Sequence, residues 1–519
     1  MEDAPLAGTR VKHVVVVGAG IGGLSAAAIL ARAGLDVTVL EAHIYAGGCA
    51  GTFFHQGYRF DAGATLAAGF YPGGPMDALA RAAGILAWPV RPEEPALTVH
   101  LAQGDPIHRW SDPTRWTTER AKLDGPAESF WEWQEQTAKA VWALASALPP
   151  WPPASLSELT DLARIGASVL RRLPSGLRAG NLAVDALTSA ARHLPAAHPQ
   201  LRLFVDGQLL ISAQTTSEHA NALYAAAALD LPRRGVVQAE GGMGAIAHTL
   251  AESIKRLGGR VLYRHEVTRL RMHAGAPVSV ETRRGGSFPV DLLILNLTPW
   301  NAAALLGADA PPPLRRLPPH PAGWGAFTVY AGIDASLVPD GFPLHHQVLL
   351  REPLGEGNST FLSISPAWDA ARAPAGRRAV TLSTHTRLDS WWGLEKDGPA
   401  YSKREAAYTD RLFGAAERVL PGIRSAAGLV LPGTPDTFVR FTRRIGGWVG
   451  GFPQTSLFRS FAPRLAPAIW LAGDSIFPGQ SVAATALGGL RVAHAVLRSL
   501  GSRLEQPDAG QQLADDAIW

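Results

Sequence analysis

The feature that most constrains this chain is a glycine-rich turn between a buried strand and a helix near the N-terminus. Residues 13–17 read HVVVV, as expected of a parallel strand that is covered on both faces. The turn GAGIGG (18–23) follows, and then a helix closed by Gly34. The next strand, DVTVL (36–40), ends at Glu41. The sequence therefore predicts a complete βαβ unit.

The glycines of this turn have mechanical roles in binding a dinucleotide. Gly18 allows the tight turn, Gly20 lets a pyrophosphate approach the backbone, and Gly23 lets the helix pack closely on the strand. The N–H groups and the positive dipole end of the helix then face the phosphates. Glu41 is placed to accept hydrogen bonds from ribose hydroxyls and would repel a 2′-phosphate, which disfavours NADP. We predict a Rossmann-like dinucleotide site here rather than an ordinary turn.

A second stretch, LAGDSIFPGQSVAATALGGLRVAHAVL (471–497), looks like another part of the same site. It reads as a strand ending in Gly473 and Asp474, followed by a glycine-rich turn and a helix without charge until Arg491. FAD carries a ribityl chain and a flavin ring that a simple NAD site has no need to hold. Asp474 can bind a ribityl hydroxyl or orient the backbone, and the uncharged helix start offers N–H groups to an anionic reduced flavin. The cofactor predicted is FAD; a tightly packed buried helix is the alternative.

Four blocks carry a family resemblance. They are GAGIGGLSAAAILARAGLDVTVLEAH (18–43), GGCAGTFFHQGYRFDAGAT (47–65), EGGMGAIAHTLAESI (240–254) and GDSIFPGQSVAATALGGLRVAH (473–494). Together they resemble the FAD-dependent carotenoid desaturase and isomerase family, the phytoene-desaturase-like flavoproteins. Within that family, HIYAGGCAGTF and FDAGATL look most like the C-3′,4′ desaturases, which act on an acyclic carotenoid end.

The resemblance implies a split cofactor site. Residues 47, 48 and 50–52 would run beside the pyrophosphate and ribityl chain, 63–65 would lie near the ring, and the backbone of Val267 would meet the adenine. The loop FTRRIGGWVGGFP (441–453) resembles the one that leads back under the flavin. Many relatives carry a basic residue after the GG pair, where this chain has Cys49, so the resemblance leaves open how charge is neutralised there. The predicted cofactor-binding residues are Gly18, Ala19, Gly20, Ile21, Gly22, Gly23, Glu41, Ala42, Gly47, Gly48, Ala50, Gly51, Thr52, Gly63, Ala64, Thr65, Val267, Gly473, Asp474, Gly479, Gln480, Ser481 and Val482.

The domain organisation expected is a woven one. The segments 1–85, 236–312 and 464–519 would assemble the FAD-binding domain. The insertions 86–235 and 313–463 would build a substrate and membrane-facing domain of α+β type. The first insertion is rich in tryptophan and proline and then turns helical, and the second contains β-like runs, which predict a mostly antiparallel sheet. Those runs are 324–333, 358–368 and 378–388.

Other chemistries find little support in the residues. The chain has no P-loop, no H-E-x-x-H and no paired C-x-x-C, and we predict no metal site. His345 and His346 lack helical ligand spacing and are expected to face solvent. No catalytic acid or base stands out; Asp61 is a possible functional carboxylate, with a backbone-orienting role favoured. Cys49 is expected to be a small packing residue rather than a nucleophile.

Composition narrows the partners. The formal net charge is +4, with no long basic run interleaved with aromatics, so nucleic acid is excluded as a partner. The single cysteine rules out an intramolecular disulfide and fits a reducing compartment, so the cytoplasm is the expected location.

The segment 157–178 predicts reversible attachment to the inner face of a membrane without a spanning helix. It places apolar residues at helical spacing together with arginines, as in helices that lie at an anionic surface. Packing on its own domain is the other interpretation. The residues are Leu159, Leu162, Ile165, Val169, Leu170 and Leu173, with Arg164, Arg171, Arg172 and Arg178.

Four functions can use this scaffold. The favoured one is a carotenoid desaturase, which passes a hydride to FAD and uses oxygen or a quinone as the electron acceptor. The second is a carotenoid cis-trans isomerase that uses reduced FAD. An amine-oxidase-like oxidoreductase and a non-catalytic prenyl-binding escort protein are further alternatives, and the intact GDSIFPGQSV element counts against the escort.

Overall fold

The computed structural model describes residues 12–123, 125, 127–172, 179–396 and 398–501. One half is built on a six-stranded sheet in the order β10-β2-β1-β14-β21-β20, parallel except for the β20–β21 pair. Its central strands β2, β1, β14 and β21 are buried on both faces, as parallel strands are, with Asp36 at the start of β2 the one exposed residue. The strands are β1 (His13–Val17), β2 (Asp36–Leu40), β10 (Arg260–Leu262), β14 (Leu292–Leu295), β20 (Arg464–Ala466) and β21 (Ile469–Leu471).

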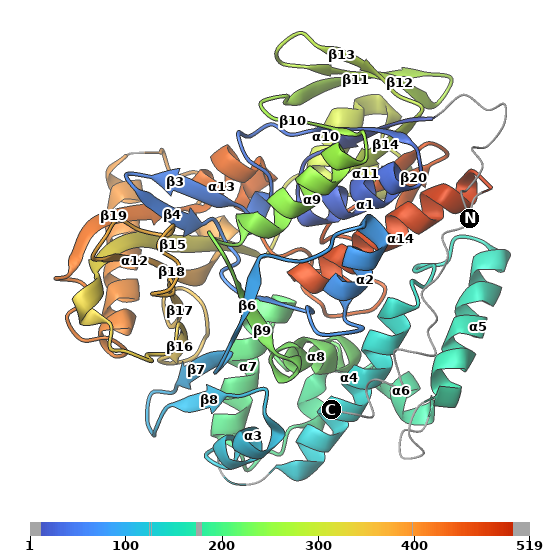
Figure 1. Ribbon diagram of the computed structural model, residues 1–519. Helices are drawn as coiled ribbons and strands as arrows, with labels where there is room; N and C mark the ends of the chain where they lie inside the picture. The colour runs from blue at the N-terminus through green and yellow to red at the C-terminus, as the bar shows by residue number, and fades with distance from the viewer. Residues whose placement is uncertain (1–11, 124, 126, 173–178, 397, 502–519) are drawn as a thin grey trace.

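Helices from distant parts of the chain cover this sheet. In Figure 1 the blue α1 (Ile21–Arg32) lies beside the red α14 (Val482–Ser499), and α9 (Gly244–Arg256) packs on the other side of α1. A β-carbon at Gly489 would stand 2.6 Å from the carbonyl oxygen of Gly22, so glycine is what permits this close approach of α1 and α14. Helix α2 (Pro75–Ala83) completes the layer.

The other half contains a seven-stranded sheet in the order β19-β15-β18-β17-β16-β7-β8, in which only β16 and β7 pair in parallel. One face packs under α12 (Pro399–Glu417) in a hydrophobic cluster that includes Val329, Leu362, Leu382 and Leu412. The strands are β7 (Leu97–His100), β8 (Ile107–Arg109), β15 (Trp324–Asp334), β16 (His345–Leu349), β17 (Ser359–Ile364), β18 (Arg377–Arg387) and β19 (Ala427–Gly433).

A helical region packs below the two sheets (Figure 1). It comprises α3 (Pro113–Arg120), α4 (Glu128–Ser146), α5 (Leu156–Arg172), α6 (Ala179–Asp185), α7 (Pro199–Ala213) and α8 (Ala222–Asp230). The smaller sheets are β3 (Thr52–His55) with β4 (Tyr58–Asp61), β5 (Ala67–Ala68) with β9 (Val236–Ala239) and β6 (Val90–Glu93), and β11 (Val267–His273) with β12 (Ala276–Thr282) and β13 (Ser287–Pro289). The remaining helices are α10 (Pro299–Leu306), α11 (Pro312–Arg315) and α13 (Pro435–Thr442).

The predicted fold class is confirmed: a Rossmann-like α/β half formed from discontinuous segments, and an α+β half with a mostly antiparallel sheet. The first helix begins at Ile21, inside the glycine turn, with Gly20 as its N-cap. Strands β7 and β8 from the first insertion extend the sheet that the second insertion builds. The domain boundaries themselves stay a prediction.

The expectation that His345 and His346 face solvent is wrong. Both side chains are buried, 1% and 2% exposed, because β16 lies between β17 and β7. Neighbouring strand residues point to opposite faces. His345 Nδ1 therefore meets Ser363 Oγ at 2.8 Å on one face, and His346 Nδ1 meets His100 Nε2 at 3.1 Å on the other.

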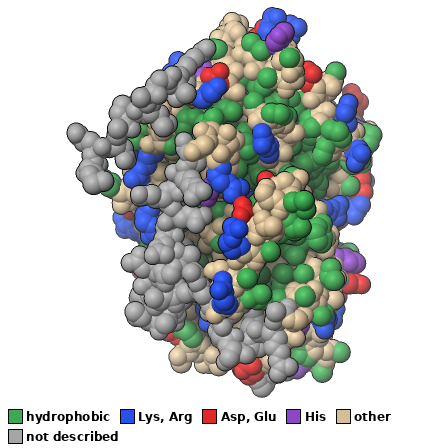
Figure 2. Space-filling model, turned by 90° about the vertical axis from the view of Figure 1, so that its right-hand side faces the viewer, with side chains coloured by type: hydrophobic (Ala, Val, Ile, Leu, Met, Phe, Trp, Pro, Cys, Tyr) green, Lys and Arg blue, Asp and Glu red, His purple; other side chains and the backbone are tan. Residues whose placement is uncertain are grey.

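The predicted surface helix is present as α5, although residues 173–178 of that prediction, Leu173 and Arg178 among them, lie outside the described residues. No described side chain of α5 is buried. Figure 2, which faces this side of the molecule, shows basic side chains lying among hydrophobic ones. In the described part of the chain, no helix is long and apolar enough to cross a membrane.

Candidate functional site

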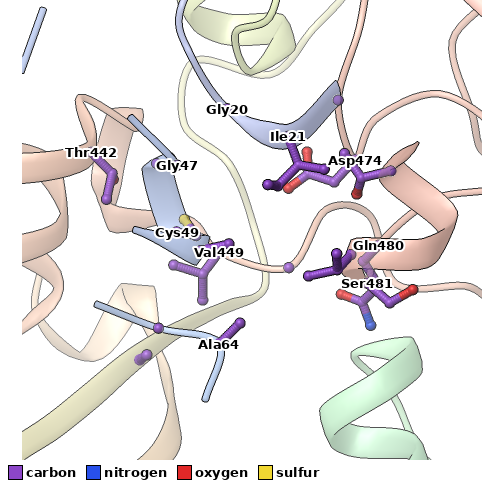
Figure 3. A pocket seen from close by; sticks show the side chains of 18 of the residues that line it. Gly20, Ile21, Gly47, Cys49, Ala64, Thr442, Val449, Asp474, Gln480 and Ser481 are labelled. Carbon is purple, nitrogen blue, oxygen red and sulfur yellow. The ribbon is translucent and has the colours of Figure 1, made fainter. Parts of the chain in front are cut away.

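A cavity of about 620 Å³ opens at the carboxyl ends of β1, β2, β14 and β21 and runs on to the antiparallel sheet. Parallel sheets of this kind bind ligands at that edge. Most of the predicted cofactor residues line it, and Figure 3 shows several of them around the space. These are Gly18, Gly20, Ile21, Gly22, Glu41, Ala42, Gly47, Gly48, Ala50, Gly63, Ala64, Thr65, Val267, Gly473, Asp474, Gln480, Ser481 and Val482.

Five predicted residues stand behind this lining: Ala19, Gly23, Gly51, Thr52 and Gly479. The space at Gly23 is filled by Asn296, since a β-carbon there would lie 2.7 Å from Asn296 Cβ. Asn296 itself lines the cavity and donates to the carbonyl oxygen of Gly18 at 3.2 Å. No sequence motif singles out Asn296, because its role comes from contact with Gly18 and Gly23 on a distant segment of the chain.

Glu41 fixes the glycine turn from the end of β2. Its Oε2 accepts a hydrogen bond from the Ala19 amide and its Oε1 one from the His43 amide, both at 2.7 Å. Burial raises the pKa of Glu41, although these two backbone hydrogen bonds and the nearby Arg443 act to lower it. Each oxygen keeps a further lone pair for a ligand hydroxyl on the cavity side.

The glycine pair after Tyr45 lies directly against the turn. The Gly47 amide donates to the carbonyl oxygen of Ala19 at 2.8 Å, and Gly47 has a φ of 116° that only glycine adopts easily. A β-carbon at Gly47 would stand 2.7 Å from Gly51 Cα. Glycine is therefore required here both for conformation and for space.

The start of α14, which the sequence showed to be uncharged, carries a polar cap. Ser481 caps the helix, accepting from the Ala484 amide at 3.1 Å. The amides of Val482 and Ala483 are left as the orphan donors of the first turn. Both residues line the cavity, so the helix presents two N–H groups to it.

Arg444 is a functional candidate that sequence reasoning passed over. Its Nη2 lies 2.8 Å from Asp474 Oδ2, its Nε donates to the Trp448 carbonyl at 2.6 Å, and its guanidinium lies next to Cys49. Burial would lower the pKa of Arg444, but Asp474 and Cys49 outweigh it and the pKa is raised. Figure 3 shows Cys49 and Asp474 on two sides of the cavity. The guanidinium next to Cys49 is thus supplied by the 441–453 loop.

Asp61 lies outside the cavity lining and has a complete set of partners. It accepts from Thr52 Oγ1 at 2.7 Å, from the Met243 amide at 2.8 Å and from Arg372 Nη2 at 2.9 Å. The side chain is 2% exposed. This arrangement suits the backbone-orienting role.

Beyond the Rossmann edge, the cavity lies between an apolar helical wall and a polar sheet wall. The helical wall consists of Leu210, Ile211, Ala228 and Leu231, with Val236 of β9 beside them. The sheet wall includes Thr328, Gln347, Ser359, Ser383 and His385. The alternation in THTR at the end of β18 indicates a polar face. It does not reveal that this face lines an enclosed cavity.

His385 is held by Gln214, the residue that ends α7. The two Nε2 atoms lie 3.2 Å apart, and burial lowers the pKa of His385 to about 4, so the imidazole is neutral at physiological pH. In the described segments, no three or more His, Cys, Asp or Glu side chains come together as a metal site.

The residues present fit a bound FAD. A cradle of glycines brings backbone to the cavity, Glu41 offers carboxylate oxygens, and two helix starts aim N–H groups into it. The volume lies within the range of about 300–1,000 Å³ that small-molecule sites occupy.

Comparisons with solved structures identify the same fold. An oxidoreductase from Methanosarcina mazei superposes with a TM-score of 0.59 at 16% identity, over 92% of this chain and 99% of that one. Putrescine oxidase bound to putrescine superposes with a TM-score of 0.59 at 16% identity, over 95% of this chain and 100% of that one. Rab GDI from Plasmodium falciparum reaches 0.50 at 9% identity, over 96% and 100%. At these identities the likeness concerns the fold alone.

Sequence comparisons extend over nearly the whole chain. Prolycopene isomerase 2 of an Oncidium hybrid cultivar, a chloroplastic protein, is 28% identical over 95% of this chain and 85% of its own length. Hydroxyneurosporene desaturase of Cereibacter sphaeroides is 28% identical over 95% of this chain and 99% of its own length. The model of the flavin containing amine oxidoreductases matches residues 21–497. The chain therefore belongs to the flavin-containing amine oxidoreductase family and is an FAD-dependent oxidoreductase, related in sequence to carotenoid isomerases and desaturases.

Proposed function

We propose that FAD lies along the Rossmann edge of the cavity, held by the cofactor-binding residues predicted above. Glu41 would bind the ribose, the α1 start the pyrophosphate, and the amides of Val482 and Ala483 the electron-rich edge of the flavin. The five residues behind the lining would act by shaping this surface. The segments 1–85, 236–312 and 464–519 would form the cofactor domain, and 86–235 and 313–463 the substrate domain.

The substrate we propose is an acyclic carotenoid, and the reaction is desaturation of the C-3′,4′ type. The observation that carries this proposal is the single cavity that joins the glycine turn of α1 to the apolar wall of α7 and α8. A long polyene can lie along Leu210, Ile211 and Leu231 with its end at the cofactor edge. The names of the relatives and the motifs HIYAGGCAGTF and FDAGATL support the substrate class.

The chain's own residues would contribute binding, orientation and exclusion of water. When bound, the flavin supplies a two-electron acceptor. The buried walls of the cavity keep water from the polyene, and the helical wall aligns the bond to be oxidised. A hydride and a proton leave neighbouring carbons, and oxygen or a quinone finally takes the electrons.

Isomerisation by reduced FAD is the second candidate, because the relatives of this chain include several prolycopene isomerases. The two reactions differ in electron balance. A desaturase removes two electrons and two protons per turnover, whereas an isomerase returns substrate of the same mass.

An anaerobic single turnover with an acyclic carotenoid and no external acceptor tests the proposal. Desaturation predicts bleaching of the oxidised flavin, matched by a product that is two hydrogens lighter and red-shifted. If oxidised enzyme is inert and pre-reduced enzyme changes the geometry at constant mass, isomerisation replaces desaturation. If folded protein neither carries nor binds FAD, the cofactor assignment to this cavity is wrong.

We further propose that the protein collects its substrate at the inner membrane surface through α5. Leu156, Leu159 and Leu170 are 82%, 51% and 41% exposed, and Arg164 and Arg171 lie exposed on the same helix. An apolar stripe with basic side chains matches an anionic lipid surface. Because a carotenoid dissolves in the lipid bilayer, the protein must contact the membrane to take up this substrate.

A further inference from the structure

Four buried polar side chains form a continuous chain of hydrogen bonds that ends at the cavity. Gln238 lies on β9, His345 on β16 and Ser363 on β17. Thr65 belongs to the segment that links β4 to β5. All four side chains are buried, and of the four only Thr65 lines the cavity. The hydrogen-bonded chain therefore runs from the interior of the protein to the cavity wall.

The contacts along this chain are close. The pairing of β16 with β17 sets His345 opposite Ser363, and His345 Nδ1 lies 2.8 Å from Ser363 Oγ. Ser363 Oγ donates to Thr65 Oγ1 at 2.7 Å. On the other side of the imidazole, Gln238 Nε2 is hydrogen-bonded to His345 Nε2. Both ring nitrogens of the buried histidine thus have a partner, as a buried polar group requires.

The direction of each hydrogen bond follows from the donors available. Ser363 has one hydroxyl hydrogen and uses it toward Thr65, so at His345 it accepts. The ring is neutral, because burial lowers the pKa of His345 to about 3, and its single N–H is therefore on Nδ1. Nε2 then carries a lone pair, and the amide nitrogen of Gln238 faces it. The two ends of the chain agree on one direction of donation, toward Thr65.

Thr65 is left with a hydroxyl hydrogen to donate. Its oxygen accepts from Ser363, and among the described residues no group accepts from this hydroxyl. Because Ser363 occupies one lone pair of the oxygen, the hydrogen is directed away from Ser363. A buried hydroxyl without an acceptor costs free energy, and Thr65 lines the cavity. The chain therefore presents one oriented donor to a molecule bound there.

The backbone holds this donor at the segment proposed to lie near the flavin ring. The Ala64 amide donates to the Cys49 carbonyl at 3.0 Å, and Figure 3 shows Ala64 and Cys49 along the cavity. A β-carbon at Gly63 would stand 2.8 Å from the same carbonyl oxygen, so the segment lies tightly against it. A hydrocarbon polyene has no acceptor for a hydroxyl hydrogen, whereas a flavin ring has carbonyl oxygens. The acceptor that fits the position of Thr65 is therefore the flavin.

We propose that the Thr65 hydroxyl donates a hydrogen bond to a carbonyl oxygen of the flavin ring and so raises the reduction potential of the flavin. Ser363, His345 and Gln238 are positioning residues, which fix the direction of this donor without touching the cofactor. The inference rests on the placement of FAD in the proposed function. Reduction adds negative charge to the ring, so an oriented donor stabilises the reduced form more than the oxidised form. A higher potential favours transfer of a hydride from the substrate.

The test measures the reduction potential of the FAD-loaded protein by equilibration with a reference dye. Thr65→Val removes the hydroxyl at nearly constant volume and should lower the equilibrium constant for flavin reduction about tenfold, which is about 30 mV for a two-electron couple. Thr65→Ser keeps the hydroxyl and should keep the potential. Ser363→Ala should shift the potential in the same direction by a smaller amount, because the Thr65 hydroxyl is then free to rotate.

Raman spectroscopy of the bound flavin gives a second measurement that does not depend on turnover. Loss of a hydrogen bond strengthens the C=O bond, so the carbonyl stretch should move to higher frequency in Thr65→Val. Thr328→Val is the matched control, because Thr328 also lines the cavity but already donates to the Gly433 carbonyl at 3.3 Å. This variant should keep both the potential and the carbonyl frequency of the wild type.

Flavin content and near-UV circular dichroism verify folding, and Thr65→Ala takes the place of Thr65→Val if that variant does not fold. An unchanged or higher potential without the Thr65 hydroxyl, or an equal shift in Thr328→Val, overturns the inference. A shift in Thr65→Val without one in Ser363→Ala overturns the positioning role of the chain. These measurements need no carotenoid, so a failure of desaturation leaves the inference standing. A protein that binds no FAD would overturn the proposed function and the inference with it.

Discussion

Arg444 Nη2 lies 2.8 Å from Asp474 Oδ2, and this contact joins two segments that both line the cavity. The side chains are only 16% and 17% exposed. Arg444 also lies next to Cys49, so its guanidinium brings a positive charge beside the glycine pair. The positive charge is present at this site, but it comes from a loop nearly 400 residues further along the chain.

Arg444→Gln should therefore weaken both the fold and the cofactor site. It leaves the Asp474 carboxylate without its partner, and breaking a pair of this kind costs about 3 kcal/mol in the free energy of unfolding. Urea unfolding of the apoprotein measures that cost, and FAD titration measures the affinity. Arg440→Gln, an exposed change on α13, is the control and should stay within about 0.5 kcal/mol.

The double variant Arg444→Gln with Asp474→Asn separates the two effects. It removes the unpaired charge, so stability should recover in part while FAD affinity stays low. Full FAD affinity in either variant would mean that the pair has no part in holding the cofactor.

Glu41→Gln should lower FAD affinity by about tenfold, and Glu41→Lys should abolish retention of FAD during purification. The carboxylate accepts from the amides of Ala19 and His43, and a glutamine would turn its NH2 group toward one of these donors. Lysine adds a cation where the ribose hydroxyls need an acceptor. Glu240→Gln, on an exposed ion pair with Arg91, is the control, and an equal loss of FAD in that variant would contradict the role of Glu41.

The parts of the site that the sequence predicted are those that local rules determine. The βαβ unit and the Gly473–Asp474 turn follow from glycine conformation and from hydrophobic periodicity within some 30 residues. Arg444, Gln214 and His385 could not be found in this way, because each acquires its role from a partner on a distant segment. His345 was misjudged for the same reason, since its burial comes from flanking strands that a local pattern does not reveal.

Arg491→Leu should destabilise the protein by about 3 kcal/mol. Arg491 is 3% exposed and donates to the Pro149 carbonyl at 2.9 Å, to the Trp151 carbonyl at 2.6 Å and to the Phe477 carbonyl. Burial lowers the pKa of Arg491 to about 10, so it remains charged at neutral pH. Leucine leaves three buried carbonyls without a donor. Urea midpoints measure the loss; Arg498→Leu, on the exposed end of α14, is the control, and equal costs would contradict the role.

Stability should fall on acidification because of His345. Burial lowers the pKa of His345 to about 3, so between pH 6.5 and pH 3 the unfolded chain binds the proton more readily than the folded one. The free energy of unfolding therefore decreases as pH falls, by about 2 kcal/mol from this residue between pH 7 and pH 5.

Glu93 acts in the opposite direction, since burial and Glu94 raise the pKa of Glu93 to about 7. The difference in unfolding free energy between wild type and His345→Gln isolates the contribution of the histidine. The variant should lose less stability on acidification, although its stability at neutral pH is lower. Parallel curves for the two proteins would contradict the assignment.

Reversing the charge of α5 should release the protein from anionic vesicles. Arg164 and Arg171 lie on a helix with no buried described side chain, beside exposed Leu159 and Leu170, so Arg164→Glu with Arg171→Glu should cut recovery in flotation with phosphatidylserine vesicles severalfold. Each basic residue near such a surface contributes about 1 kcal/mol, and the effect should shrink at high salt. The matched control is Arg315→Glu with Arg316→Glu, an exposed pair at the end of α11 that removes the same net charge. Equal recovery of the α5 variant and the wild type would remove α5 from membrane attachment, and equal loss in the control would show that net charge alone governs it.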